Sequence, residues 1–188
     1  MKKIMAFGAS NSRNSINKKI ASYAGSQIED ASVELLDLND FELPIYSIDI
    51  ETESGVPEPV YRFKSYIDEA DGIIISFAEH NGNYTAVFKN LFDWLTRIDR
   101  DVWQNKPMFL LSAAPGSRGA KKVLKSAVID MGRKGGDIVA VLSLPSLWQN
   151  FNENDGITEP NLKNSFEEQV SRFRKALFNN ISTVKIEN

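Results

Sequence analysis

The sequence predicts an α/β fold in which a parallel sheet is covered by helices on both faces. Five short apolar segments alternate with longer amphipathic segments along the 188 residues, and this alternation is typical of parallel sheets. The length is sufficient for one sizeable hydrophobic core and short for two. No internal repeat, low-complexity tract or linker interrupts the pattern. We therefore expect a single domain over residues 1–188.

The apolar segments define the expected strands. Residues 33–38 alternate apolar and polar side chains, which is typical of a strand nearer an edge, whereas residues 72–77 are apolar almost throughout and should be buried. In chain order, the expected strands are residues 3–7, 33–38, 72–77, 108–112 and 138–142.

The amphipathic stretches predict helices. In residues 84–98, for example, Leu91 and Trp94 fall on one helical face. Residues 39–59 contain proline, serine and acidic side chains without a clear period, so we expect a long surface loop there. Residues 183–188 are expected to form a loosely held tail. In chain order, the expected helices are residues 15–28, 59–70, 84–98, 120–134 and 161–178.

The composition excludes several kinds of chemistry. The chain has no cysteine, which excludes disulfides, thiolate catalysis and cysteine-ligated metals, and His80 is its one histidine, which excludes sites that need two. Much of the usual catalytic repertoire is therefore missing and we expect no metal site, so any redox chemistry requires a bound cofactor, which would itself carry the reaction without a catalytic side chain.

Charge and hydropathy restrict the partners and the location. The net charge is −3 and the basic residues are scattered, so nucleic acid is not an expected partner. No apolar run approaches the roughly 20 residues that cross a bilayer, and residues 4–7 are too short for the core of a signal peptide. We expect a cytoplasmic protein with no membrane partner.

The strand-to-helix loops of such a sheet meet at its carboxyl edge, where ligands bind. Residues 10–15 read Ser-Asn-Ser-Arg-Asn-Ser and lead into a helix, whose N-terminus favours a phosphate. Serine hydroxyls add further donors. A single Ser or Asn would serve as a helix cap, so capping and phosphate binding both stay open for this loop. Neither the dinucleotide-binding nor the P-loop glycine pattern is present.

Two further loops belong to the same edge. Residues 78–84 read Ala-Glu-His-Asn-Gly-Asn-Tyr and are compatible with an ordinary polar turn that carries a solvated His80. In residues 112–120, glycines and other small residues would let a flat ring lie against the backbone. An ordinary turn with Ser117 as a helix cap explains the same residues.

Taken together, the three loops resemble those of the NADPH-dependent FMN reductase family, the NAD(P)H:quinone or azo reductase-like flavoproteins. The family's first-loop motif is similar to G-S-x-R-x-x-S-x-N, and residues 9–17 match its serines and its asparagine. Ser12 stands at the family's arginine position, with Arg13 displaced by one. The more specific middle motif is similar to P-E-Y-N-G followed by L-K-N-x-x-D-W. It appears here in residues 78–82 and 88–94, with His80 at the tyrosine position.

The resemblance implies a flavodoxin-like three-layer sandwich with strand order 2-1-3-4-5 and one non-covalently bound FMN. The first loop would bind the phosphate, the second would lie against the isoalloxazine largely through backbone groups, and the third would flank the other part of the ring. The implied cofactor-binding residues are Ser10, Ser12, Ser15, Ile16, Asn17, Glu79, His80, Asn81, Gly82, Ser112, Pro115 and Gly116. The residues implied to be structural are Lys89, Asn90, Asp93 and Trp94, with Trp94 in the core.

The activity that the resemblance implies is that of an FMN-dependent NAD(P)H oxidoreductase. Hydride would pass from NADPH or NADH through the flavin to a quinone, an azo compound, a free flavin or a similar small acceptor. A homodimer or homotetramer is expected, because the flavin of relatives lies near a subunit contact. Two alternatives stay open: a flavodoxin-type electron carrier without NAD(P)H turnover, and a flavin-free binding protein of the same fold.

Overall fold

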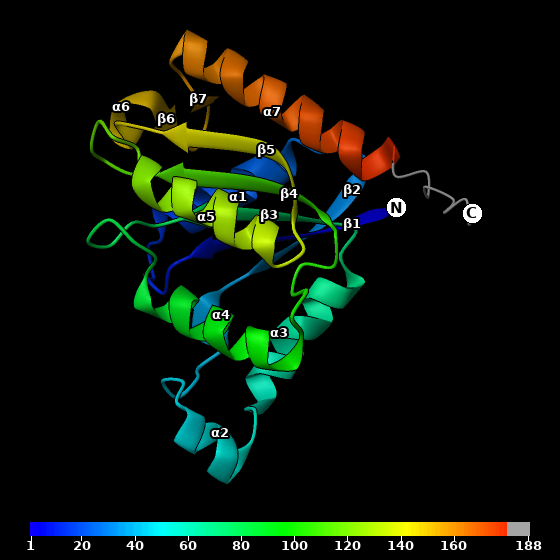
Figure 1. The fold of residues 1–188 in the computed structure, drawn as a ribbon. Helices are drawn as coiled ribbons and strands as arrows, with labels where there is room; N and C mark the ends of the chain where they lie inside the picture. The colour runs from blue at the N-terminus through cyan, green and yellow to red at the C-terminus, as the bar shows by residue number, and fades with distance from the viewer. Residues whose placement is uncertain (180–188) are drawn as a thin grey trace.

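A computed structural model describes residues 1–179, which are built around a five-stranded parallel sheet (Figure 1). The strand order is β2-β1-β3-β4-β5, the order of the flavodoxin-like doubly wound fold. The predicted fold class and strand order are therefore confirmed, while the expected tail at residues 183–188 lies outside the described residues. The strands are β1 (Lys2–Ala9), β2 (Ala31–Leu36), β3 (Gly72–Phe77), β4 (Pro107–Ala113) and β5 (Asp137–Leu144).

Two layers of helices bury opposite faces of this sheet. The helices on one face are α1 (Ile16–Ser26) and α7 (Pro160–Asn179), and those on the other are α3 (Glu58–Glu69), α4 (Ala86–Ile98) and α5 (Lys121–Arg133). Successive residues of a strand point to opposite faces. Ile74 accordingly packs with α1 and α7, while its neighbours Ile73 and Ile75 pack with the other three helices. Among residues 1–179, no helix has both the length and the apolar character needed to cross a bilayer.

The segment expected to be a long loop contains helical structure, so that prediction was wrong. A 3-10 helix, η1 (Leu38–Asp40), is followed by α2 (Ile48–Ser54), whose N-cap Ser47 accepts a hydrogen bond from the Ile50 N–H at 3.2 Å. None of the residues of α2 is buried. The helix therefore leaves no apolar period in the sequence. It is held by Glu51, whose carboxylate accepts hydrogen bonds from Arg97 Nε of α4 at 2.9 and 3.0 Å, and by Ile50, which packs partly buried against the core.

Polar side chains of α4 hold the chain that leads into α2. The Pro44 carbonyl accepts hydrogen bonds from Asn90 Nδ2 at 3.0 Å and from Trp94 Nε1 at 2.9 Å, and Asn90 Oδ1 accepts one from the Tyr46 N–H at 2.8 Å. Trp94 is completely buried. These contacts assign Asn90 and Trp94 the structural role that was expected of them, with the segment before α2 as the partner.

Three small elements between β5 and α7 were not expected from the sequence. They are α6 (Leu147–Asn150), β6 (Phe151–Asn152) and β7 (Gly156–Ile157), and the two strands form an antiparallel hairpin. Tyr23 of α1 fixes this hairpin, because its ring packs edge-on against Phe151 with a centroid distance of 5.3 Å. The fixing partner lies more than a hundred positions away in the sequence, so local patterns do not reveal it.

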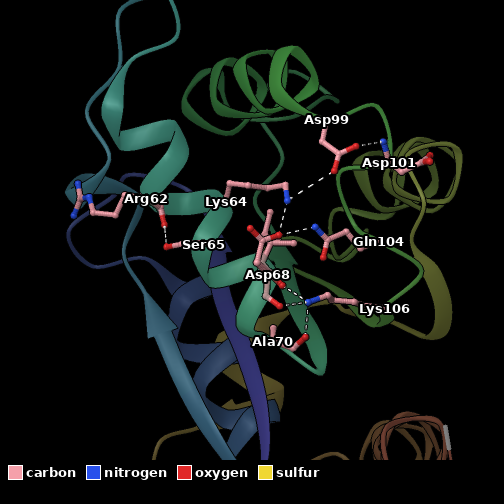
Figure 2. Close-up of polar contacts among 10 residues, drawn as sticks. Arg62, Lys64, Ser65, Asp68, Ala70, Asp99, Asp101, Gln104 and Lys106 are labelled. Atoms are coloured by element: carbon pink, nitrogen blue, oxygen red, sulfur yellow. Dashed lines mark hydrogen bonds and ion pairs between the residues drawn. The ribbon is translucent and has the colours of Figure 1, made fainter. Parts of the chain in front are cut away.

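The C-terminal end of α3 is capped by a lysine from the segment before β4 (Figure 2). The last carbonyls of a helix have no partner within the helix. Here Lys106 Nζ donates to the carbonyls of Ile67, Asp68 (2.8 Å) and Ala70 (2.6 Å). The Asp68 carboxylate also accepts hydrogen bonds from Lys64 and, at 2.6 Å, from Gln104. This cluster fastens α3 to the segment that enters β4.

Candidate functional site

The register of the sheet brings the three polar loops to one edge. Ala9 of β1 pairs with Phe77 of β3, and Phe77 pairs with Ser112 of β4. The loops that follow these strands therefore begin at the same level. In Figure 1 the arrowheads of β4 and β5 point toward this edge, on the side of the molecule opposite the labelled N-terminus.

Two serines shape the first loop through hydrogen bonds to its own backbone. The Ser10 hydroxyl accepts one from the Ser12 N–H at 3.1 Å, and Ser15, the N-cap of α1, accepts one from the Lys18 N–H at 3.1 Å. Ser10 and Ser15 are both nearly buried, whereas the Ser12 side chain is exposed. A hydroxyl that accepts a hydrogen bond can still donate its own hydrogen. Capping and anion binding are thus compatible roles for Ser15.

The start of α1 adds backbone donors to these hydroxyls. Helices leave their first N–H groups without an internal partner. Among the hydrogen bonds of residues 1–179, none uses the backbone N–H of Ile16 or Asn17. The loop consequently offers hydroxyl and backbone N–H donors together with the partial positive charge of a helix N-terminus, the combination that a phosphate requires.

Asn17 departs from the expected role in one respect. Its Oδ1 accepts hydrogen bonds from the Ser76 hydroxyl at 2.7 Å and the Ala113 N–H at 3.0 Å, and its Nδ2 donates to the Ala113 carbonyl at 3.2 Å. The side chain is buried beneath the loop, where it ties α1 to β3 and β4. It is not available to a phosphate, so only the backbone N–H of Asn17 remains as a donor.

Two residues outside the predicted set position the first loop. A Cβ at Gly8 would lie 2.3 Å from the backbone nitrogen of Lys18, so only glycine lets the start of α1 lie directly against β1. Thr85, the N-cap of α4, donates its hydroxyl to the Ala9 carbonyl at 2.9 Å and joins the first loop to α4. A threonine directly before an amphipathic helix was the signal available in the sequence.

The second loop is a tight hairpin turn. His80 and Asn83 exchange two backbone hydrogen bonds, each 3.0 Å long. Between them, Asn81 and Gly82 have φ angles of +53° and +76°. Positive φ at both central residues is characteristic of a type I′ turn, for which Asn-Gly is a preferred pair. The turn exposes His80 and Asn81 at its tip.

Glu79 connects the second loop to α5. Helix α5 follows Ala120, which has a φ of +57° and no side-chain group that could cap the helix. The Glu79 carboxylate takes this role, because its Oε2 accepts a hydrogen bond from the Val123 N–H at 3.0 Å. The side chain of Glu79 is therefore engaged in the protein, and the expected contact of its backbone with a ligand stays a prediction.

The third loop is anchored at its far end by two serine hydroxyls. The hydroxyls of Ser112 and Ser143 both donate to the Gly119 carbonyl, each at 2.7 Å. Ser112 is completely buried, so its side chain does not flank a ligand as expected but fixes the loop. Pro115 and Gly116 are exposed, and their place beside a ring stays a prediction.

Cavities lie on both sides of the second loop and beside the first. One of about 260 Å³ joins the second and third loops and is lined by Glu79 and residues 114 and 116–120. Another of about 470 Å³ lies next to the first loop, and its lining includes Asn11, the segment before α2 and the start of α4. FMN needs donors for its phosphate and a flat surface for its ring. The donors of the first loop and the small exposed residues of the third meet these requirements.

Comparison with known proteins supplies a family match. The family model described as NADPH-dependent FMN reductase matches residues 2–144, which include all three loops. The chain is 34% identical over 119 residues to the 2-hydroxy-1,4-benzoquinone reductase of a Burkholderia species, covering 62% of this chain and 63% of that protein. It is 30% identical over 81 residues to the quinone reductase of Escherichia coli K12, covering 43% of each. The matches thus span less than two thirds of either relative.

Similarity to solved structures supports the fold. The flavoenzyme NAD(P)H:(acceptor) oxidoreductase FerB from Paracoccus denitrificans superimposes with a TM-score of 0.74 and 23% identity, over 94% of this chain and 97% of that one. At this level of identity, the likeness concerns the arrangement of the helices and strands.

Proposed function

The chain belongs to the NADPH-dependent FMN reductase family, and from this premise we propose that it binds FMN and passes reducing equivalents from NAD(P)H to a quinone or a similar small acceptor. An azo compound and a free flavin are the other acceptors that this proposal includes. The observation that carries it is the set of donors at the start of α1, which lies at the carboxyl edge of the sheet.

The phosphate of FMN is assigned to the first loop. The hydroxyls of Ser10, Ser12 and Ser15 and the backbone N–H groups of Ile16 and Asn17 are its proposed donors. Hydrogen bonds to an ionised acceptor are roughly twice as strong as neutral ones. The tight contact at Gly8 and the buried side chain of Asn17 keep this helix start in place, so the donors are oriented before the ligand arrives.

The isoalloxazine is assigned to the second and third loops. The backbone of residues 79–82 and the small residues Pro115 and Gly116 would hold the ring and orient it toward the second substrate. When bound, FMN supplies the two-electron chemistry. No side chain of this chain is proposed to act as a nucleophile, acid or base, so its contribution is to bind, to orient and to keep water from the ring.

We also propose a homodimer or homotetramer in the cytoplasm, where nicotinamide cofactors are supplied. Ile45, which lines the cavity beside the first loop, is 82% exposed, and Ile48 at the start of α2 is 59% exposed. Neighbouring exposed apolar side chains mark interaction surfaces. Light scattering on the purified protein should give two or four times the 21.1 kDa mass of the chain. A mass of one chain at all concentrations would refute the oligomer.

An anaerobic titration tests the proposed activity. Purified protein should take up added FMN, with quenching of the flavin fluorescence, and NADPH or NADH should then bleach the flavin absorbance. Adding 1,4-benzoquinone should restore the absorbance. A protein that takes up no FMN would refute the proposal. Bound flavin that neither nucleotide bleaches would also refute it and would favour the electron-carrier alternative.

A further inference from the structure

A cluster of cations lines the cavity on the far side of the second loop. Arg118 precedes α5, and Lys121, Lys122 and Lys125 lie in its first turns. With Glu79, Asn81 and Gly82 they line a cavity of about 690 Å³, here called the basic groove. A Cβ at Gly82 would lie 2.8 Å from Lys122 Nζ, so this ammonium group sits against the turn. The volume falls within the roughly 300–1,000 Å³ of small-molecule sites.

Stability does not explain this cluster. A helix N-terminus carries partial positive charge and is stabilised by acidic side chains, whereas cations there are unfavourable. The first turn of α5 contains no acidic residue. Among residues 1–179, none of the four cations has a carboxylate within ion-pair distance. Four neighbouring cations without an ion pair among the described residues, with Glu79 as the one carboxylate in the groove lining, indicate an anionic ligand.

The cationic side chains, and not the amides of the helix, would hold this ligand. The Val123 N–H at the start of α5 already donates to Glu79 at 3.0 Å. The N-terminus of α5 is thus capped by a carboxylate of the protein. The four side chains are exposed and remain free to contact a solute.

The basic groove adjoins the cavity assigned to the flavin ring, because Glu79 and Arg118 line both. A ligand that spans the two would place one end at the ring and an anionic part among the cations. A nicotinamide dinucleotide has this form, with its reactive ring separated from its phosphate groups. The diphosphate carries about two negative charges and a phosphate monoester adds about 1.5 to 2, so the charges of NADPH match the four cations.

We propose that the basic groove binds the phosphate groups of the dinucleotide and selects NADPH over NADH through the 2′-phosphate. This inference rests on the proposed function, since it concerns the co-substrate of the same reaction. Lys122 and Lys125 lie three positions apart in α5, so they share one face of the helix, and both line the groove. They are the specificity-determining residues in this arrangement. The contacts are exposed and hence screened by salt.

Binding measurements on the FMN-loaded protein test the inference. We compare Lys122→Gln/Lys125→Gln with Lys163→Gln/Lys175→Gln, which removes the same charge from exposed positions of α7. By calorimetry, the groove variant should bind NADP⁺ about tenfold more weakly, as expected for two exposed ion contacts. Its affinity for NAD⁺ should fall less, so the ratio of the two affinities decreases. The KM values for NADPH and NADH should change in parallel with these affinities.

Further readouts separate the possible failures. Equal binding of NADP⁺ and NAD⁺ by the original protein would overturn the inference, and so would equal effects of the groove variant and the α7 variant. In either case, bleaching of the bound flavin by NADPH or NADH would leave the proposed function intact. If no flavin binds, the proposed function fails, and calorimetry with NADP⁺ alone still tests the groove. The ligand-free groove variant should melt no lower than the original protein. A lower melting temperature would indicate a structural role and overturn the inference.

Discussion

Replacing Ser15 by Asp should stabilise the ligand-free protein and abolish FMN binding at the same time. Ser15 caps α1 by accepting a hydrogen bond from the Lys18 N–H at 3.1 Å. Asp and Asn cap helices about as well as Ser does. The added negative charge at a helix N-terminus contributes about 0.3–1 kcal/mol. For a chain of this length, this gain corresponds to a rise of about 1–4 °C in melting temperature.

The same charge opposes the phosphate. Two unit charges about 5 Å apart interact by about 3 kcal/mol at an effective dielectric constant of about 20. A loss of this size weakens binding more than about 100-fold. The variant Ser15→Asn keeps the cap without the charge and is the matched control. It should lose only the single hydroxyl donor of Ser15, a loss of about 1.5 kcal/mol or about tenfold in affinity.

Melting curves of the ligand-free variants and fluorescence titrations with FMN and with riboflavin measure these effects. Riboflavin lacks the phosphate, so its affinity should differ little between Ser15→Asp and Ser15→Asn. Unchanged affinity of Ser15→Asp for FMN would refute the assignment of the phosphate to the first loop. Equal losses for FMN and riboflavin would show that the substitution disturbs the site as a whole, which would refute the reasoning from charge.

Three further substitutions test the framework of the fold, each by urea unfolding. In Gly8→Ala, the new Cβ would lie 2.3 Å from the backbone nitrogen of Lys18, so we expect a loss of about 3 kcal/mol. The control Gly132→Ala has no atom within 4 Å and should gain about 0.5–1 kcal/mol in its helix. Lys106→Met removes the three hydrogen bonds at the end of α3 and should cost about 2 kcal/mol. An unchanged urea midpoint for Gly8→Ala or for Lys106→Met would contradict the stabilising role given to the contact that the variant changes. Burial acts to raise the pKa of Asp71, but hydrogen bonds, including one from a backbone N–H of β1, outweigh it and hold the pKa below 3.8. The stabilisation by Asp71 is therefore complete above about pH 4 and is lost as the pH falls through the lower folded pKa. Asp71→Asn should make the free energy of unfolding less dependent on pH in this range. The same loss of stability at acid pH in the variant and the original protein would contradict a stabilising role of the Asp71 carboxylate.

The sheet could be predicted from the sequence because its strands are buried on both faces. Residues 72–77 are completely or almost completely buried, and their apolar run leaves few alternatives to a strand. Helix α2 gave no such signal, because it buries none of its residues and is held by Arg97 of α4 through Glu51 and by Asn90 and Trp94 through the preceding segment. The hairpin of β6 and β7 depends in the same way on a distant ring, that of Tyr23.

The candidate site was predictable at the level of its loops but not of its side chains. The Ser-rich segment indicates a helix start, and Asn81-Gly82 indicates a tight turn, because both signals are local. The partners of Asn17 lie up to 96 positions away, so nothing in the segment distinguishes a buried anchor from a ligand contact. Glu79 is similar, since its partner Val123 lies 44 positions away.

Each loop of the site is held by a side chain that reaches the backbone of a neighbouring element. Thr85 bonds the carbonyl that ends β1, Glu79 bonds the start of α5, and Ser112 bonds the end of the third loop. These longer-range side-chain contacts thus fix the loops, and the serine hydroxyls of the first loop, the backbone N–H groups and the small residues are the groups proposed to meet the ligand. Recognition by backbone does not depend on which exposed side chains the loops carry. Within residues 1–179 the side chains of Ser12 and His80 make none of the fixing hydrogen bonds. The two departures from the family's motifs therefore leave the shape of the site intact, and we expect them to act on the properties of the bound flavin and the choice of acceptor.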